Sequence, residues 1–321
     1  MILAGIDEAG LGPKLGPLCV VCAALRTPEG WSAAVPWQAL SAAIADKPGR
    51  AEKRLVVADS KKVFAARSLA ALERTSLTFF STWPSAEPLP LPRSVFLAIL
   101  GAFETIEDIA RCPWYAHDWL APICCTPAAI KDEALRLFQA MAAAGAAVAG
   151  LQARVTVETI FNRRIAAGLN KAQALWYDIA NHLRWLAESF PDEAIAVCVD
   201  KQGGRHAYLP LLASSFPGAL WQAIAEGALL SEYVLQRRGP PMHVAFIPRA
   251  EQTSFAVALA SIMAKYLRER FMLELNDFFI ARLPNLHPTA GYPADAPRFI
   301  AAVRPLLAQL GVSEDSLVRC R

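Results

Sequence analysis

Residues 5–17 read GIDEAGLGPKLGP and join an apolar start to a second apolar stretch at residues 17–25. Asp7 and Glu8 therefore stand at the end of a short buried strand and directly before a turn rich in glycine and proline. Acids in this position usually belong to a charged surface turn. The alternative is that Asp7 and Glu8 belong to a functional site. The other motifs of the sequence bear on the choice between these two interpretations.

The composition is that of a folded chain with a large core. Its 321 residues are 55% hydrophobic and 19% charged, which suits one large domain or two ordinary ones. The formal net charge is +3. A mildly basic chain permits a polyanionic partner without requiring one.

The seven cysteines do not form the pattern of a disulfide framework. Cys19 and Cys22 form a C-x-x-C inside an apolar run, and no second such pair completes a zinc site. We expect reduced thiols. No leader-like start and no apolar run long enough to cross a bilayer is present, so the expected location is the cytoplasm, with no membrane partner.

Hydrophobic patterns predict a mixed α/β sheet flanked by helices. The continuous apolar run 193–200 suits a strand covered on both faces. Strands are expected at 1–7, 17–25, 53–58, 76–83, 154–160, 193–200 and 243–248, and helices at 65–75, 94–110, 128–151, 170–190 and 254–275.

Four acids stand at or just beyond strand ends: Asp7, Glu8, Asp200 and Glu251. Acids at strand ends can converge at one edge of an open sheet, and oxygen ligands of this kind suit Mg²⁺. Two such ions can clamp the attacking and leaving oxygens of a phosphodiester. Neighbouring strand residues point to opposite faces, so Asp7 and Glu8 share an ion only if the following glycines turn the chain. Scattered surface acids remain the alternative.

Five motifs in order resemble type 2 ribonuclease H: GIDEAGLGPKLGPL, ADSKK, a strand ending in Asp, ALASIMAK and HPTAGY. The resemblance covers roughly residues 2–80 and 155–300. It implies a ribonuclease-H-like catalytic domain of residues 1–83 and 151–321, with a helical insertion subdomain at 84–150. It also implies a site of Asp7, Glu8, Asp200 and Glu251 that holds two Mg²⁺ or Mn²⁺ ions.

The resemblance further implies an endoribonuclease that hydrolyses RNA in RNA–DNA hybrids or at ribonucleotides embedded in DNA. Its nucleic-acid contacts fall on the glycine loop, the DSK segment, the loop after Asp200, the ASI-x-AK helix and the AGY tyrosine. These candidate substrate-binding residues are Gly10, Leu11, Gly12, Lys14, Ser60, Lys61, Lys201, Arg205, Lys265 and Tyr292. The lysines and Arg205 can equally be solvated, and Tyr292 can be an ordinary core or turn residue.

The sequence departs from the family pattern at three places. Leu11 replaces an arginine that would supply a charged, forked donor. Glu251 replaces an aspartate and is one methylene longer. The insertion is longer than usual and carries Trp83, Trp114, Tyr115 and Trp119, which either pack in a helical subdomain or stack bases. It is also a candidate surface for a protein partner.

Two other functions therefore remain open. One is a catalytically impaired nucleic-acid-binding or scaffold protein of the same fold, which Leu11 and Glu251 favour. The other is a divergent nuclease for another nucleic-acid structure, which the insertion favours.

Overall fold

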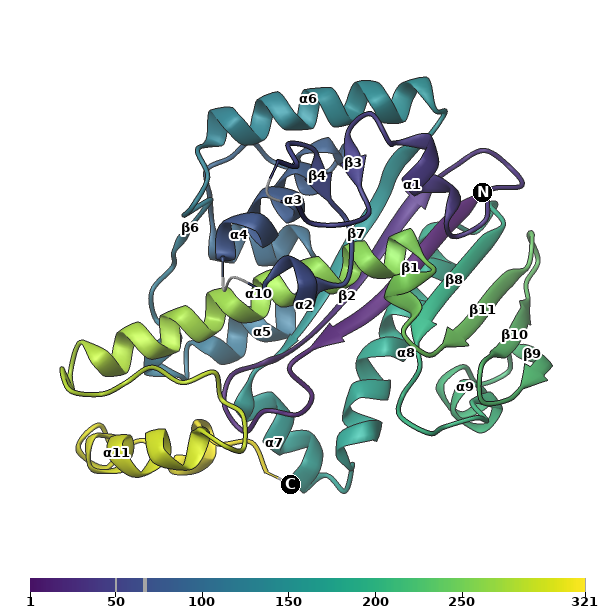
Figure 1. Cartoon of the computed structure of the whole chain (residues 1–321). Helices are drawn as coiled ribbons and strands as arrows, with labels where there is room; N and C mark the ends of the chain where they lie inside the picture. Colours follow the sequence, from purple (N-terminus) through teal and green to yellow (C-terminus); the bar gives the residue numbers. More distant parts are fainter. Residues whose placement is uncertain (50, 66–67, 321) are drawn as a thin grey trace.

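The computed structural model describes residues 1–49, 51–65 and 68–320. A seven-stranded mixed sheet lies at its centre, in the order β7-β2-β1-β8-β11-β10-β9 (Figure 1). Its strands are β1 (Ile2–Ala9), β2 (Leu18–Arg26), β7 (Ala147–Thr156), β8 (Ile195–Asp200), β9 (Leu220–Glu226), β10 (Ser231–Gln236) and β11 (Met242–Ile247). The predicted α/β class, with a mixed sheet flanked by helices, is confirmed.

Helices cover both faces of this sheet. The longer helices are α3 (Leu69–Thr82), α6 (Pro127–Ala143), α8 (Lys171–Ser189), α10 (Phe255–Ile280) and α11 (Ala296–Gln309). The shorter ones are α1 (Val35–Ala39), α2 (Ser60–Val63), α4 (Arg93–Ile99), α5 (Phe103–Ile109), α7 (Glu158–Ala166) and α9 (Leu209–Ser215). Two further small sheets pair β3 (Ile44–Ala45) with β4 (Leu55–Val56) and β5 (Leu91–Pro92) with β6 (Leu120–Ala121).

The alternation of side chains along β1 divides the core into two clusters. Ile2, Ala4 and Ile6 pack with α8 on one face, whereas Gly5 lies under α10 on the other. A Cβ on Gly5 would lie 2.1 Å from the Val257 backbone nitrogen, so only glycine permits this contact. The close approach fixes α10 directly over the end of β1.

Four predicted elements depart from the structure. The predicted helix 94–110 is divided into α4 and α5, and the predicted strand 154–160 ends at Thr156, before α7 begins at Glu158. The predicted strand 76–83 is part of α3, in which residues 75–80 are all buried, so no polar face revealed the helical period. The predicted helix 128–151 ends at Ala143, and β7 begins at Ala147 by pairing with β2. Residues 66–67 of the expected helix 65–75 lie outside the described residues.

Buried side chains of the segment 84–150 belong to the core cluster on the face of the sheet that α10 covers. Trp114 and Tyr115 are buried there, and Trp119 is 4% exposed, so these rings pack rather than face solvent. Residue 150 falls inside β7. The division of the chain at residues 84 and 150 stays a prediction.

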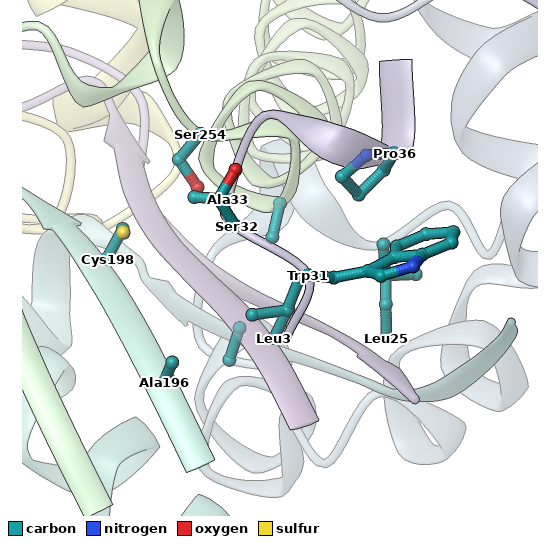
Figure 2. Close-up of a pocket in the computed structure, with 11 residues that line it drawn as sticks. Leu3, Leu25, Trp31, Ser32, Ala33, Pro36, Ala196, Cys198 and Ser254 are labelled. Carbon is teal, nitrogen blue, oxygen red and sulfur yellow. The ribbon is translucent and has the colours of Figure 1, made fainter. Parts of the chain in front are cut away.

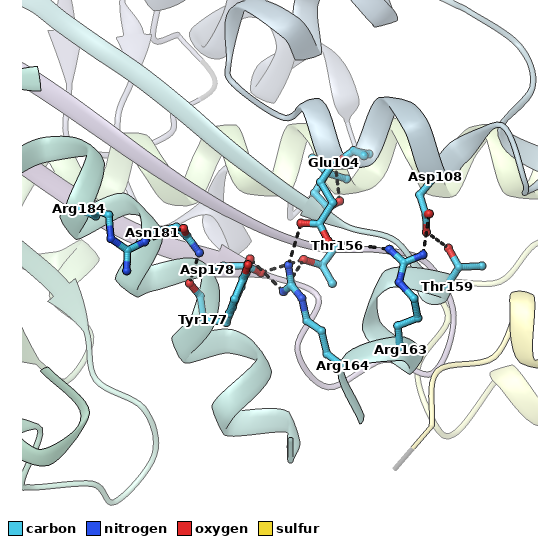
Figure 3. Close-up of polar contacts among 12 residues, drawn as sticks. Glu104, Asp108, Thr156, Thr159, Arg163, Arg164, Tyr177, Asp178, Asn181 and Arg184 are labelled. Atoms are coloured by element: carbon cyan, nitrogen blue, oxygen red, sulfur yellow. Dashed lines mark hydrogen bonds and ion pairs between the residues drawn. The ribbon is translucent and has the colours of Figure 1, made fainter. Parts of the chain in front are cut away.

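Ion pairs join α5 of this segment to α7, and α7 to α8 (Figure 3). Arg163 of α7 donates to Asp108 of α5 at 2.8 Å. Arg164 donates to Asp178 of α8 at 3.0 Å and to Glu104 of α5 at 3.2 Å. Asp178 is fully buried, and Arg164 and Thr156 hydrogen-bond to its carboxylate, although burial outweighs them and raises its pKa.

The seven cysteines are free thiols, as predicted. No helix within the described ranges is long and apolar enough to cross a membrane. A small cavity of about 120 Å³ lies beside the middle of β1 and β8, lined by Leu3, Leu25, Trp31, Cys198 and Ser254 among others (Figure 2). It is apolar and distinct from the acids at the strand ends.

Candidate metal and nucleic-acid site

Asp7 and Asp200 lie beside each other where two parallel strands end. The last paired residues of β1 and β8 are Ile6 and Val199, and both acids follow immediately. Because Ile6 and Val199 belong to the cluster of the α8 face, the next residues point toward α10. The Asp200 Oδ1 accepts a hydrogen bond from the Ala250 N–H at 3.0 Å.

Glu8 lies on the other side of the strand. β1 stays regular to Ala9, with Glu8 opposite Val20, so the turn begins only after both acids. The glycines therefore do not bring Glu8 round to the face of Asp7. Glu8 nevertheless lies within electrostatic reach of Asp200 and Glu251, because the strand end is at the rim of the sheet.

Burial raises the pKa of all four acids, and repulsion by neighbouring carboxylates adds to this effect for Asp7, Glu8 and Glu251. Burial, followed by the charge of Glu8, holds the pKa of Asp7 well above its ordinary value. Burial and then Asp200 raise the pKa of Glu8 to about 7. Burial is also the main cause of the raised pKa values of Asp200 and Glu251. The four acids therefore form a single electrostatic cluster.

Lys61 is the lysine that offsets this negative charge. It lowers the pKa of Glu8, Asp200 and Glu251, although burial outweighs it in each case. Lys61 belongs to α2, whose N-cap Asp59 accepts a hydrogen bond from the Lys61 N–H at 2.9 Å. One lysine facing four carboxylates leaves an excess of negative charge.

The donor set fits a hard divalent cation by atom type and by charge. Among the residues that the structure describes, however, no three Asp, Glu, His or Cys side chains are placed to hold one ion. Asp7 Oδ1 accepts from the Glu8 N–H at 2.8 Å, and Asp200 is held by Ala250. The carboxylates therefore reach a common ion only after side-chain rotation.

Ser261 is a site residue that the sequence analysis missed. Its hydroxyl bonds to Asp7 and lies 2.9 Å from the Ser60 hydroxyl. Ser261 thereby links α10, α2 and the end of β1. The local signal for Ser261 is its place in the SIMAK segment, four residues before Lys265.

The basic candidates lie in different surroundings. The Lys201 ammonium is buried and donates to the Gly227 carbonyl and to Ser231 at 2.9 Å, so its charge is directed inward. Lys265 pairs with Glu269 at 2.6 Å and lies 4.8 Å from the Phe64 ring. The Arg205 guanidinium lies 5.8 Å from the centroid of the Tyr208 ring.

The glycine loop combines buried and exposed residues. Leu11 packs against the core of the α8 face. Gly12 is surrounded by open space, and Gly10 has a φ of +97° that glycine adopts readily. The Lys14 N–H donates to the Gly291 carbonyl at 2.7 Å, which brings the loop next to Tyr292. Tyr292 is 47% exposed.

Two buried arginines hold this loop from beneath. Arg319 donates to the carbonyls of Gly10 and Pro13, and its backbone N–H donates to the Lys14 carbonyl at 2.9 Å. Arg268 of α10 donates to the Leu15 carbonyl at 3.4 Å. Four carbonyls of the loop, those of residues 10, 13, 14 and 15, therefore accept hydrogen bonds from inside the protein.

No protein-family model matches the chain, and no curated protein matches it. Among solved structures it is similar to an RNase HII from Archaeoglobus fulgidus in complex with PCNA, at 14% identity over 100% of this chain and 95% of the other, with a TM-score of 0.43. It is also similar to Bst-RNase HIII in complex with Mn²⁺, at 15% identity over 99% and 66% of the two chains, with a TM-score of 0.44. It is similar as well to the ribonuclease H2 from Pyrococcus horikoshii OT3, at 13% identity over 99% of this chain and 92% of the other, with a TM-score of 0.42. At these scores the assignment of the site rests on this chain's own residues.

Proposed function

We propose that this chain is a divalent-metal-dependent endonuclease that hydrolyses RNA in RNA–DNA hybrids or at ribonucleotides embedded in DNA duplexes. The observation that carries the proposal is the cluster of four acids at the ends of the parallel strands β1 and β8 and just beyond β11, with Lys61 facing it. The order of the motifs around these acids supports the choice of nucleic acid as substrate.

Each residue of the cluster has a role in this reaction. Asp7, Glu8, Asp200 and Glu251 would hold the cation, which supplies charge stabilisation and an activated water when bound. Ser261 orients the Asp7 carboxylate. Lys61 presents a positive charge to the phosphate, and the glycine loop lets the strand backbone approach. The products carry a 3′-hydroxyl and a 5′-phosphate.

The test is cleavage of a labelled DNA duplex that contains one ribonucleotide, beside an all-DNA duplex and an RNA–DNA hybrid, with Mg²⁺ or Mn²⁺. The expected result is ribonucleotide-dependent cutting. Asp7→Asn and Asp200→Asn should each lower it at least 100-fold, because each removes a charged metal ligand. Glu107→Gln, an exposed acid of α5, is the matched control and should retain full activity.

The inward packing of Leu11 favours a second function, that of a nucleic-acid-binding protein without turnover. This packing leaves the loop without the forked donor that the family carries there. Duplex binding with no cutting of any of the three substrates would establish this alternative and contradict the nuclease. Equal cutting of all three would instead show a nuclease without ribonucleotide specificity.

A further inference from the structure

Arg249 stands at the acidic edge of the sheet, in the turn between β11 and the short 3₁₀ helix η2 (Ala250–Gln252) that carries Glu251. The last paired residue of β11, Ile247, lies directly opposite Asp200 of the parallel strand β8 (Figure 1). Neighbouring strands are about 4.8 Å apart. Arg249 is two residues beyond Ile247 and is therefore a neighbour of the acids on the β11 side.

The backbone of Arg249 is strained. Its φ of 55° and ψ of 44° are left-handed, and it is the one residue other than glycine with a positive φ in the part of the chain that the structure describes. The turn directs two successive N–H groups at Asp200: the Ala250 N–H donates to Asp200 Oδ1 at 3.0 Å, and the Arg249 N–H lowers the pKa of the same carboxyl. Glycine or asparagine would adopt this backbone with less strain, so the arginine side chain needs an explanation of its own.

The Arg249 side chain has no partner within residues 1–49, 51–65 and 68–320. It is exposed, and it forms no hydrogen bond, ion pair or ring contact with any of them. The carboxylates of the neighbouring cluster are the closest candidates, yet Arg249 pairs with none of them. An accessible forked donor therefore remains available to an anion from outside the protein.

We propose that Arg249 binds a backbone phosphate of the nucleic-acid substrate, next to the phosphate that is cleaved at the acidic cluster. This inference rests on the proposed function and names a further substrate contact of the same site. A guanidinium holds a phosphate through two parallel N–H donors. Leu11 leaves the glycine loop without such a fork on the β1 side of the cluster, and Arg249 supplies one on the β11 side.

The position of Arg249 suits a neighbouring phosphate. Phosphates of one strand recur about every 3.4 Å along the axis of a duplex. A strand whose cleaved phosphate lies at Asp200 therefore places its next phosphates within reach of the adjacent strand end of β11. Because the turn that carries Arg249 also donates to Asp200, one segment positions both the carboxylate and the substrate.

Fluorescence anisotropy with the ribonucleotide-containing duplex and Mg²⁺ tests the contact. The full chain carries Asp7→Asn, so that binding is measured without cleavage. Adding Arg249→Asn should weaken binding at least fivefold and lower the slope of log K against log salt by about one, as one lost phosphate contact does. Arg238→Asn is the matched control, because Arg238 is exposed in the turn between β10 and β11 at the opposite edge of the sheet. It should change neither value, and equal effects of the two variants would overturn the proposal.

Thermal unfolding separates this contact from a structural role. Arg249→Asn should leave the melting temperature equal or higher, since asparagine tolerates the left-handed backbone and the arginine has no protein contact to lose. Arg249→Lys keeps the charge without the fork and should recover part of the affinity. Weaker binding accompanied by a lower melting temperature of Arg249→Asn would show a structural role and overturn the assignment.

A duplex with single neutral methylphosphonates around the ribonucleotide locates the phosphate. One position should weaken binding to the chain with Arg249 and cause no further loss in Arg249→Asn, because the two changes remove the same interaction. Additive losses at every position would contradict a contact with one phosphate.

Failure of this inference and failure of the nuclease give different results. Ribonucleotide-dependent cutting with unchanged duplex affinity of Arg249→Asn overturns the contact and leaves the nuclease intact. Duplex binding that depends on Arg249, without cutting by the natural chain, supports the contact and contradicts the nuclease. Absence of duplex binding overturns both.

Discussion

The folded protein strongly favours the neutral form of the His182 imidazole. It lies on α8 against the sheet, with Nδ1 2.8 Å from Gln152 Oε1 and Nε2 3.1 Å from the Val20 carbonyl. Burial lowers the pKa of its imidazole to about 3, from an ordinary value of 6.5. The unfolded chain therefore takes up the proton first as the pH falls.

This difference predicts a loss of stability below pH 6.5. Because the unfolded state binds more protons between pH 6.5 and 3, the free energy of unfolding decreases as the pH is lowered through that window. The loss should reach about 2 kcal/mol at pH 5. Urea unfolding at pH 7.5 and pH 5 measures it.

The control is His182→Gln, which cannot take up a proton. Subtracting its pH dependence from that of the natural chain removes the contribution of the acids at the strand ends, whose raised pKa values act in the opposite direction. Equal pH dependence of the two proteins would contradict a neutral His182.

At the scale of secondary-structure elements, the contact between β1 and α10 depends on the absence of a Cβ atom at Gly5. Gly5→Ala should lower the free energy of unfolding by about 3 kcal/mol, because its Cβ would overlap the backbone of Ala256 and Val257. Gly12→Ala is the matched change in open space with an ordinary φ, and it should cost less than about 0.5 kcal/mol. Thermal unfolding of both variants provides the comparison, and equal stabilities would refute it.

The same scale shows why some elements were predictable and others were not. α8 is predicted as a helix over residues 170–190, and its capping box of Asn170 and Gln173 is a purely local signal. The strands β9 and β10 were not predicted, because β9 is a largely exposed edge strand without a clear alternation of burial. β7 was expected to begin at residue 154 rather than 147, since its first residues are defined by pairing with β2.

The electrostatic cluster could be anticipated from the ends of the strands, but its surroundings could not. Asp7 and Asp200 follow directly from two apolar runs that become parallel neighbours. Ser261 and Arg319 reach the site from residues more than 250 positions away in the sequence, and no local pattern records such contacts. The inward direction of the Lys201 ammonium likewise depends on the hairpin between β9 and β10.

At the scale of the whole molecule, Arg319 joins the two ends of the described chain. Arg319→Met should lower the free energy of unfolding by about 2 kcal/mol or more, because the Gly10 and Pro13 carbonyls lose a charged donor. Hydrogen exchange of residues 10–17 should accelerate at the same time. Unchanged exchange in this loop would contradict the contact.

Arg304→Gln is the comparison for this variant. Arg304 lies on α11 and pairs with Glu314 at 2.8 Å, but its side chain is 64% exposed. Exposed pairs contribute little, so its removal should leave both the stability and the exchange of residues 10–17 almost unaltered.

The contact of Arg319 with the glycine loop also has a consequence for biosynthesis. The ribosome adds the side chain that satisfies the carbonyls of this loop about 300 residues after the loop itself, which at ordinary rates of synthesis is some tens of seconds. During that interval the acids at the end of β1 exist without the loop geometry of the finished protein. A nascent chain therefore completes this region only when residue 319 has left the exit tunnel, and a prematurely terminated product lacks it.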